Sequence, residues 1–385
     1  MKKVLFLAYN VGLGDVISFS PLFLLAMENY SVDVVYTTGD PLPIGKLFFE
    51  KEIKGGLLRF LKKSEFSSAK SSEYDFTILA DRRLFSLAME MGKQAGCVIP
   101  IPLQKKRVGE RLLYNCVFRP VLWLCGAHPK EILANSNERI SKVVFEQFVH
   151  VAKIKASYSQ FFERVRSRIE IKMSGQTPHM YSKSKKQLKG GTILVHLFRD
   201  LDYKRIDNNH LALAAKVICE EFPSHTVLVL TNPNNQWEKE AAEFFSKECN
   251  SNNLVAKLIS PALPEICSLS LSASLYVGVD HGISHLASMF CPLSVVIYGG
   301  SKKLSLIHLL WPPQIDGEVK NLTSNLSLLM GKNRSALLLH PSENEYYNQS
   351  VKNSTLINAI MDNFKEAIMI AKNSKANSQV TGEVK

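Results

Sequence analysis

Two glycine-containing turns carry the residues whose types and spacing could support chemistry. The first is "NVGLGD", in which Asp15 follows Gly12 and Gly14 and precedes an apolar run. Glycines let a backbone bend sharply and let a substrate approach it closely. A carboxylate at the start of a helix can cap free N–H groups, or it can take a proton from an attacking hydroxyl. The spacing alone leaves both interpretations of Asp15 open.

The second turn is "VGVDHGISHLA", in which Asp280, His281 and Gly282 separate an expected strand from an expected helix. The N–H groups and the positive dipole end of a helix start bind phosphate well. Gly282 would let a diphosphate approach the backbone. Asp280 could cap the helix or bind sugar hydroxyls. His285 lies one turn inside the helix, where a structural histidine is the alternative.

A third motif, "HLFRDLDYKRID", places cations in a loop beside the second turn. His196 follows an expected strand, and Lys204 and Arg205 come a few residues later. A cation in this loop could neutralise a diphosphate leaving group. The alternative is a solvated surface charge, and the sequence does not decide between the two.

Short apolar segments alternate with helical patterns on both sides of a polar, basic stretch. Residues 4–8, 32–38 and 74–81 are expected strands, and the same alternation restarts at residue 192. This pattern predicts two α/β units, each with a doubly wound parallel sheet. Because ligands bind beyond the carboxyl ends of such strands, both turns fall where a site is expected.

These patterns also predict where the domains begin and end. The N-terminal domain is expected at 1–167, a linker at 168–191 and the C-terminal domain at 192–350. Apolar residues at helical spacing predict a C-terminal helix at 351–373. The remaining residues, 374–385, are expected to be a disordered tail.

Composition limits the classes of partner and compartment. The net charge of +12 and pI near 9.2 favour an anionic partner, which could be nucleic acid, a membrane surface or a phosphorylated substrate. No helix-turn-helix, RNP or zinc pattern supports nucleic acid, so it ranks last. The seven cysteines are spread widely without a CxxC pair, which favours a reducing, cytoplasmic compartment over a disulfide framework. No stretch reaches the roughly 18 apolar residues that span a bilayer.

Together, "GLGDVISFSPLFLLA", the loop from His196 to Lys204, and "VGVDHGISHLA" followed by "VVIYGG" resemble glycosyltransferase family 9. These are the ADP-heptose heptosyltransferases of lipopolysaccharide core assembly. The resemblance covers residues 1–30 and 190–300, whereas 40–170 shares only the general α/β pattern. It implies a GT-B architecture, in which two Rossmann-like domains face a central cleft. The sugar nucleotide would bind the C-terminal domain, and the acceptor would bind the N-terminal one.

The resemblance also implies an inverting transfer that needs no metal and no cofactor. Asp15 resembles the family's general base, and Gly12 and Gly14 are its neighbouring active-site glycines. Glu238 corresponds, in a weaker alignment, to a ribose-binding glutamate. The donor-binding residues carried over by motif are Lys204, Asp280, His281, Gly282, His285 and Glu238.

The chain departs from the family pattern on the donor side. The family usually has Thr or Ser where His281 stands, and "GPT" where Gly299–Ser301 reads "GGS". The spacing from His196 to Lys204 is also about a residue longer. These departures concern the identity of the sugar nucleotide more than the type of reaction.

A basic stretch in the N-terminal half is a candidate acceptor site. Lipid A and the inner core carry phosphates and Kdo carboxylates, so the implied acceptor is a phosphorylated glycolipid. Basic side chains would also hold the protein peripherally against the anionic inner leaflet of the membrane. The residues are Lys105, Lys106, Arg107 and Arg111.

Several alternatives stay open. The same fold could use another nucleotide sugar, a capsule precursor or a protein hydroxyl. A GT-B sugar-nucleotide epimerase would act on the donor without any acceptor. A binding module without catalysis would not depend on the charge of Asp15.

Overall fold

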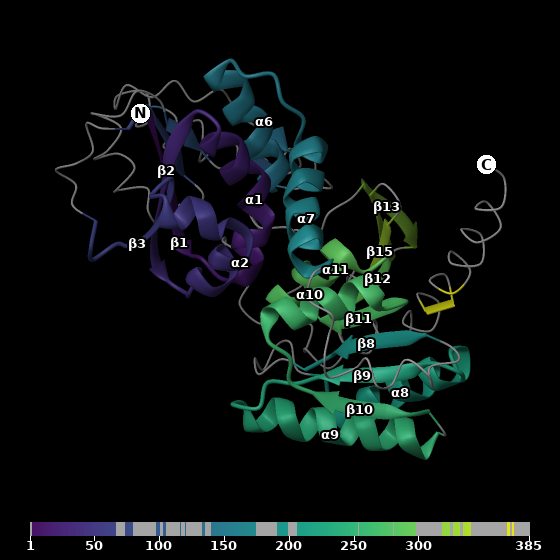
Figure 1. The fold of residues 1–385 in the computed structure, drawn as a ribbon. Helices are drawn as coiled ribbons and strands as arrows, with labels where there is room; N and C mark the ends of the chain where they lie inside the picture. The colour runs from purple at the N-terminus through teal and green to yellow at the C-terminus, as the bar shows by residue number, and fades with distance from the viewer. Residues whose placement is uncertain are drawn as a thin grey trace. The chain divides into compact units, whose positions relative to one another are not determined.

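The computed structural model describes two units, which meet in the chain between Ile171 and Lys172. Each unit is an α/β layer structure (Figure 1). The described residues are 2–66, 74–79, 98–100, 103–104, 116, 120, 133–134, 140–174, 191–198, 206–252, 254–279, 281–297, 318–323, 326–331, 334–339, 368–369 and 372.

The first unit is built on five parallel strands in the order β3-β2-β1-β4-β5. The order runs outward from β1 in both directions, so the sheet has a topological switch point between β1 and β4. Its elements are β1 (Lys2–Asn10), α1 (Leu13–Met27), β2 (Tyr30–Thr38), α2 (Leu42–Lys54), β3 (Leu58–Lys62), β4 (Phe76–Leu79), β5 (Val98–Pro100), β6 (Leu103–Gln104), β7 (Leu133–Ala134), α6 (Ile140–Ala152) and α7 (Tyr158–Ser174).

Strand β1 is buried on both faces, as the central strand of a doubly wound sheet should be. Phe6 packs edge-to-face against Phe19 and Phe23 of α1, with ring centroids 4.8 and 5.2 Å apart. Its neighbours Leu5 and Leu7 pack in a separate cluster with Val35 and Leu79. Alternate residues of one apolar run therefore supply the cores of two different layers.

Helix α7 corrects the predicted linker, which was expected to begin at residue 168. The helix continues to Ser174, because one side of it is held to the first unit. Ile169 is buried, and the Arg168 guanidinium contacts Glu52 of α2 at 2.6 Å. One turn earlier, Arg164 contacts Glu28 at 2.7 Å. The rest of the predicted linker, from residue 175 to 190, lies outside the described residues.

The second unit repeats the topology of the first. Its strands β10-β9-β8-β11-β12 are parallel, and the switch point lies between β8 and β11. Its elements are β8 (Thr192–His196), α8 (Asn208–Glu221), β9 (Thr226–Leu230), α9 (Gln236–Ser251), β10 (Ala256–Ile259), α10 (Leu263–Ser272), β11 (Leu275–Val279), α11 (Gly282–Phe290) and β12 (Leu293–Ile297).

Three further strands extend the second sheet beyond β12, and the sequence pattern did not predict them. Strand β15 (Arg334–Leu339) pairs in parallel with β12. Strands β14 (Leu326–Gly331) and β13 (Glu318–Thr323) then continue antiparallel. The sheet is therefore parallel through its centre and mixed at this edge.

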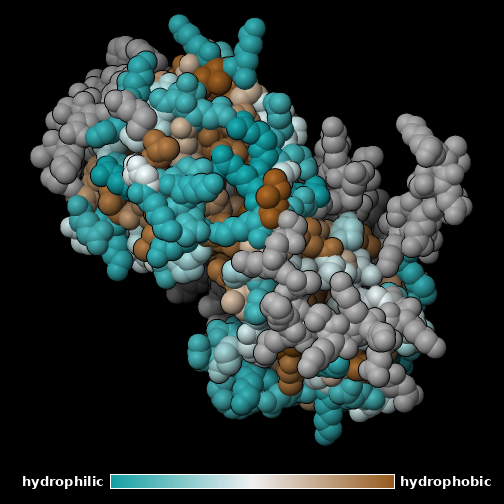
Figure 2. All heavy atoms as spheres, in the orientation of Figure 1, coloured by the Kyte–Doolittle hydropathy of each residue, from teal (hydrophilic) through white to brown (hydrophobic). Residues whose placement is uncertain are grey.

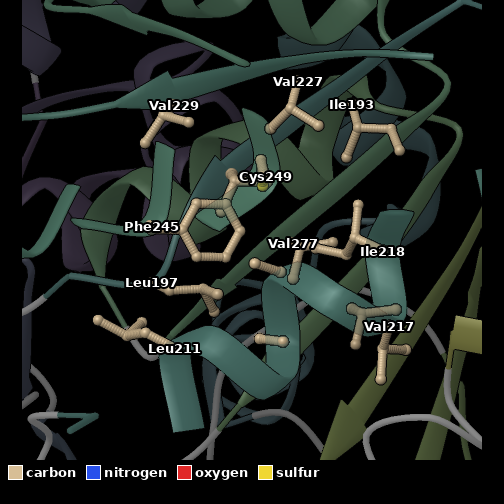
Figure 3. Packing of buried hydrophobic residues seen from close by; sticks show 14 of the residues in the cluster. Ile193, Leu197, Leu211, Val217, Ile218, Val227, Val229, Phe245, Cys249 and Val277 are labelled. Carbon is tan, nitrogen blue, oxygen red and sulfur yellow. The ribbon is translucent and has the colours of Figure 1, made fainter. Parts of the chain in front are cut away.

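Helices cover both faces of the second sheet, with α8 and α9 on one side and α10 and α11 on the other (Figure 1). Figure 3 shows the first of these layers, where Phe245 of α9 lies among Val229, Val277 and Leu197. Ile368 joins this core, and Lys372 contacts Glu221 of α8 at 3.0 Å. Residues 368–369 and 372, which are the described part of the predicted C-terminal helix, are helical. Their contacts place them in the second unit.

The predicted α/β fold class with two doubly wound parallel sheets is confirmed. In the face drawn in Figure 2, the described surface is largely hydrophilic, with hydrophobic residues in smaller patches between. None of the helices in the described ranges combines the length and apolarity that crossing a membrane demands.

Candidate functional site

The first predicted turn lies at the switch point of the first sheet. Strand β1 ends at Asn10, and α1 begins three residues later, at Leu13. The Val11 N–H donates to the Thr38 carbonyl at 3.0 Å, which ties the turn to the end of β2. The turn therefore lies at the carboxyl edge of the sheet, where a ligand site is expected.

Asp15 is not the N-cap that its sequence position allowed. Gly12 is the N-cap of α1, and Asp15 stands three residues later, in the first turn. Its Oδ2 accepts a hydrogen bond from the Gly12 N–H at 2.9 Å. This is half of a capping box, because Gly12 has no side chain with which to return the bond. The carboxylate is held at the positive end of α1 and is partly exposed.

The two glycines of this turn are not required by backbone conformation. Gly12 has φ −99° and ψ −173°, which any residue can adopt. Gly14 lies within the helix, and neither glycine has a positive φ. A Cβ on Gly12 would lie 3.7 Å from the Asp15 Oδ2, an ordinary contact. The backbone conformation therefore does not require glycine at either position, and close approach by a substrate stays a prediction.

The second predicted turn joins β11 to α11, beside the switch point of the second sheet. His281 is the N-cap of α11, and its Nδ1 accepts the Ile283 N–H at 3.0 Å. A Ser or Thr hydroxyl at an N-cap makes the same kind of bond. The His281 imidazole thus serves as the cap at the position where the sequence departs from the pattern of the resembled family.

His196 approaches this turn from the neighbouring strand. It is the last residue of β8, is buried, and its ring centroid lies 4.9 Å from that of His281. Because β8 and β11 are adjacent, their carboxyl ends meet at one edge. Both histidines were singled out from the sequence, but no sequence pattern indicated that their rings are in contact. His285 follows on α11 and is partly exposed.

Three residues that the sequence did not single out shape the end of β11. The fully buried Tyr276 hydroxyl lies 2.8 Å from the Ser284 Oγ, which in turn donates to the Val279 carbonyl. A Cβ on Gly278 would lie 2.2 Å from the Tyr276 Oη. A tyrosine two residues before a glycine does not by itself predict a packing contact or a hydrogen bond. Only the structure reveals this arrangement.

Glu238 lies at the same edge of the second sheet, in the first turn of α9. Asn235 is the N-cap of this helix and accepts the Glu238 N–H at 3.1 Å. The Glu238 side chain is buried. A buried carboxylate near the positive end of a helix is stabilised there, and strand β9, which precedes it, is next to β8.

A third helix at this edge begins with an acidic cap. Asp207 is the N-cap of α8 and accepts from the His210 N–H at 3.0 Å and from the His210 Nδ1 at 2.7 Å. Burial alone would raise the pKa of Asp207. The two hydrogen bonds from His210 and the charge of that ring outweigh the burial and lower the pKa below its usual value.

Several predicted site residues lie outside the described residues, and their roles stay predictions. On the donor side these are Lys204 and Asp280, and on the acceptor side Lys105, Lys106, Arg107 and Arg111. Within the described ranges, no group of three or more His, Cys, Asp or Glu side chains could hold a metal ion. That transfer needs no metal stays a prediction too.

No protein-family model and no curated protein sequence matches the chain. Solved structures do match. Heptosyltransferase WaaC of E. coli with ADP-2-deoxy-2-fluoro heptose has a TM-score of 0.50 at 15% identity, covering 94% of this chain and 99% of that one. A glycosyl transferase family 9 structure from Veillonella parvula has a TM-score of 0.47 at 12% identity, covering 95% and 98%. UDP-GlcNAc 2-epimerase from Neisseria meningitidis has a TM-score of 0.43 at 12% identity, covering 76% and 82%.

The likeness to heptosyltransferase WaaC extends over nearly the whole length of both chains. At this level of identity it establishes a shared fold, which is the GT-B type of fold. The resemblance predicted from the two turns is confirmed at that level: the chain is similar in fold to a heptosyltransferase.

Proposed function

We propose that this protein is an inverting glycosyltransferase that transfers heptose from ADP-heptose to a lipopolysaccharide or lipooligosaccharide core acceptor. The observation that carries the proposal is the position of the two predicted turns. Each follows a strand that borders the switch point of its own sheet, where open α/β sheets bind ligands. One turn presents a carboxylate, and the other presents the start of a helix.

In the proposed reaction, Asp15 is the general base. Its carboxylate takes the proton of the acceptor hydroxyl while that oxygen forms a bond to the anomeric carbon. The bond from the anomeric carbon to the diphosphate oxygen breaks, and the nucleoside diphosphate leaves with the electron pair. Attack from the face opposite the leaving group inverts the anomeric centre. The Gly12 N–H holds the carboxylate at 2.9 Å and so limits its rotation.

The donor is proposed to bind the second unit. The positive end of α11 at Gly282 would stabilise the negative charge of the leaving diphosphate. Lys204 and Asp280 are proposed to assist as the motif implies, and Glu238 to bind the ribose. The bound ADP-heptose analogue in the E. coli structure supports a nucleotide-sugar donor for this fold.

The acceptor is proposed to be a phosphorylated glycolipid bound by the first unit. Lys105, Lys106, Arg107 and Arg111 would contact its phosphates and carboxylates, and would hold a cytoplasmic protein against the anionic inner leaflet. The net charge of +12 supports an anionic acceptor but does not select one.

A donor panel with and without acceptor tests the proposal. Nucleotide release is measured with ADP-heptose, UDP-GlcNAc and other nucleotide sugars, each with and without a heptose-free core glycolipid. We expect release only with ADP-heptose and only when the acceptor is present. Transfer from another donor would contradict the heptosyltransferase assignment. An isomerised sugar nucleotide formed from donor alone would identify an epimerase and contradict transfer altogether.

A further inference from the structure

A short chain of hydroxyl groups joins the end of β11 to the first turn of α11. The Tyr276 Oη lies 2.8 Å from the Ser284 Oγ, and the Ser284 hydroxyl donates to the Val279 carbonyl. A serine hydroxyl has one hydrogen to donate. Since Ser284 gives that hydrogen to Val279, Tyr276 must be the donor to Ser284. Burial raises the pKa of Tyr276, which keeps this phenol protonated and able to donate.

Gly278 makes room for this chain. Gly278 and Tyr276 are two residues apart on β11, so they lie on the same face of the strand. A Cβ at Gly278 would lie 2.2 Å from the Tyr276 Oη and 2.6 Å from Cε1 and Cζ. These distances are far below a normal contact, so the tyrosine ring occupies the space that any other side chain would need. The ring reaches Ser284 because residue 278 is a glycine.

The hydroxyl chain closes the turn that carries the predicted donor site. Val279 is the last residue of β11, and Ser284 is the third residue of α11. The Ser284 N–H also donates to the His281 carbonyl at 2.9 Å. Backbone and side chain of Ser284 therefore set where α11 starts relative to the strand that precedes it. Because Tyr276 and Ser284 are buried, breaking either hydrogen bond would leave a polar group unsatisfied. Any other position of the first turn of α11 relative to β11 is therefore disfavoured.

We propose that Tyr276 and Ser284, with Gly278 beneath them, are positioning residues that hold the first turn of α11 in place to bind the diphosphate of the nucleotide-sugar donor. The proposal rests on the donor site proposed above. These residues do not touch the donor themselves. They act through the backbone of His281 and Gly282, because the N–H groups and the dipole at the start of α11 must lie in a defined place to favour an anion.

Nucleotide binding by matched variants tests the proposal. The affinities of the full-length protein for ADP and, in parallel, UDP are measured by calorimetry for wild type, Ser284→Ala, Tyr276→Phe and Gly278→Ala. We expect about tenfold weaker binding in each variant, the equivalent of one buried hydrogen bond. In turnover, the donor KM should rise while the acceptor KM stays the same, because only the donor turn is displaced.

Ser270→Ala is the control for simple loss of stability. The Ser270 hydroxyl is also buried in the second unit and donates to a backbone carbonyl, that of Ile266, at 2.7 Å within α10. We expect a comparable drop in melting temperature with unchanged nucleotide affinity. If Ser284→Ala binds as wild type does, or if Ser270→Ala weakens binding as much, the positioning role is wrong.

The two nucleotides separate this inference from the proposed function. If wild type binds UDP and not ADP, the ADP-heptose proposal fails, and the variants still test the positioning role with UDP. If wild type binds neither nucleotide, the donor site and the positioning role are both overturned.

Discussion

The strand-to-helix turns at β1–α1 and β11–α11 each follow a strand that borders the switch point of its own sheet, yet their chemistry is opposite. In the first, the cap is a glycine and a carboxylate folds back to its N–H at 2.9 Å. In the second, an imidazole accepts a helix N–H at 3.0 Å, and hydroxyl groups tie the helix to the strand. One helix start therefore carries a negative charge, and the other is capped by a neutral group.

This difference shows how one topology can serve two roles. The positive end of α1 is compensated internally by Asp15, which suits a group that must stay ionised to accept a proton. The cap of α11 itself adds no negative charge to the positive end of that helix, because an imidazole that accepts a hydrogen bond at Nδ1 is not an anion. The fold places one helix start beside the switch point of each sheet. The residue that hydrogen-bonds to the free backbone groups at each helix start determines the charge there.

Removing the charge of Asp15 should have the largest effect on the first turn. Asp15→Asn keeps an oxygen that can accept the Gly12 N–H but no longer takes a proton. We expect kcat to fall by about 10²–10⁴, the usual value of general-base assistance. Transfer is measured at saturating donor and acceptor, and the melting temperature should change little.

Glu265→Gln provides the matched control for that experiment. Glu265 stands at the equivalent position of α10, and its Oε2 accepts the Ala262 N–H at 2.9 Å. The substitution removes one carboxylate charge from a capping box of the same geometry, so kcat should be unchanged. A loss of less than tenfold in Asp15→Asn, or an equal loss in Glu265→Gln, would refute Asp15 as the base.

The cap of α11 should tolerate a hydroxyl but not a methyl group. His281→Ser preserves an acceptor for the Ile283 N–H, whereas His281→Ala removes it. We expect His281→Ala to cost about 1 kcal/mol in the free energy of unfolding, and His281→Ser a few tenths. Denaturant titration measures both, and nucleotide affinity should follow the same order. Equal loss in the two variants would show that the ring contact with His196, rather than the cap, is what matters.

The acidic cap of α8 should give the smallest effect, present near neutral pH and lost in acid. Asp207 has a lowered pKa in the folded protein, so its contribution to stability is present above the pKa of the unfolded chain. That contribution is lost as the pH falls through the folded pKa. Asp207→Asn keeps a good cap without the charge. Melting temperatures of the two proteins should therefore differ near neutral pH and converge below about pH 4. A constant difference down to pH 2 would contradict a charge effect.

Sequence patterns predicted the central strands of both sheets because each is a continuous apolar run buried on two faces. Strands β1, β2, β8, β9, β11 and β12 all appear where such runs stand. The pattern missed α2, whose backbone departs from helical geometry at Phe49, and the short strand β10, whose exposed residues break the apolar run. It also began the linker too early, at residue 168, because Arg168 lies within α7 and forms an ion pair with Glu52.

By itself, the sequence determined that two turns follow buried strands, that the first carries Asp15 and that the second carries Asp280 and His281. These features are local, because apolar runs and glycine-containing turns are formed by residues that are neighbours in the sequence. Only the tertiary structure decided which side chains from different elements meet. The contact of His281 with His196 and the hydroxyl chain from Tyr276 to Ser284 join residues from different elements. Such contacts depend on strand order and on which face a side chain takes, and these are set when the sheet and its helices pack together.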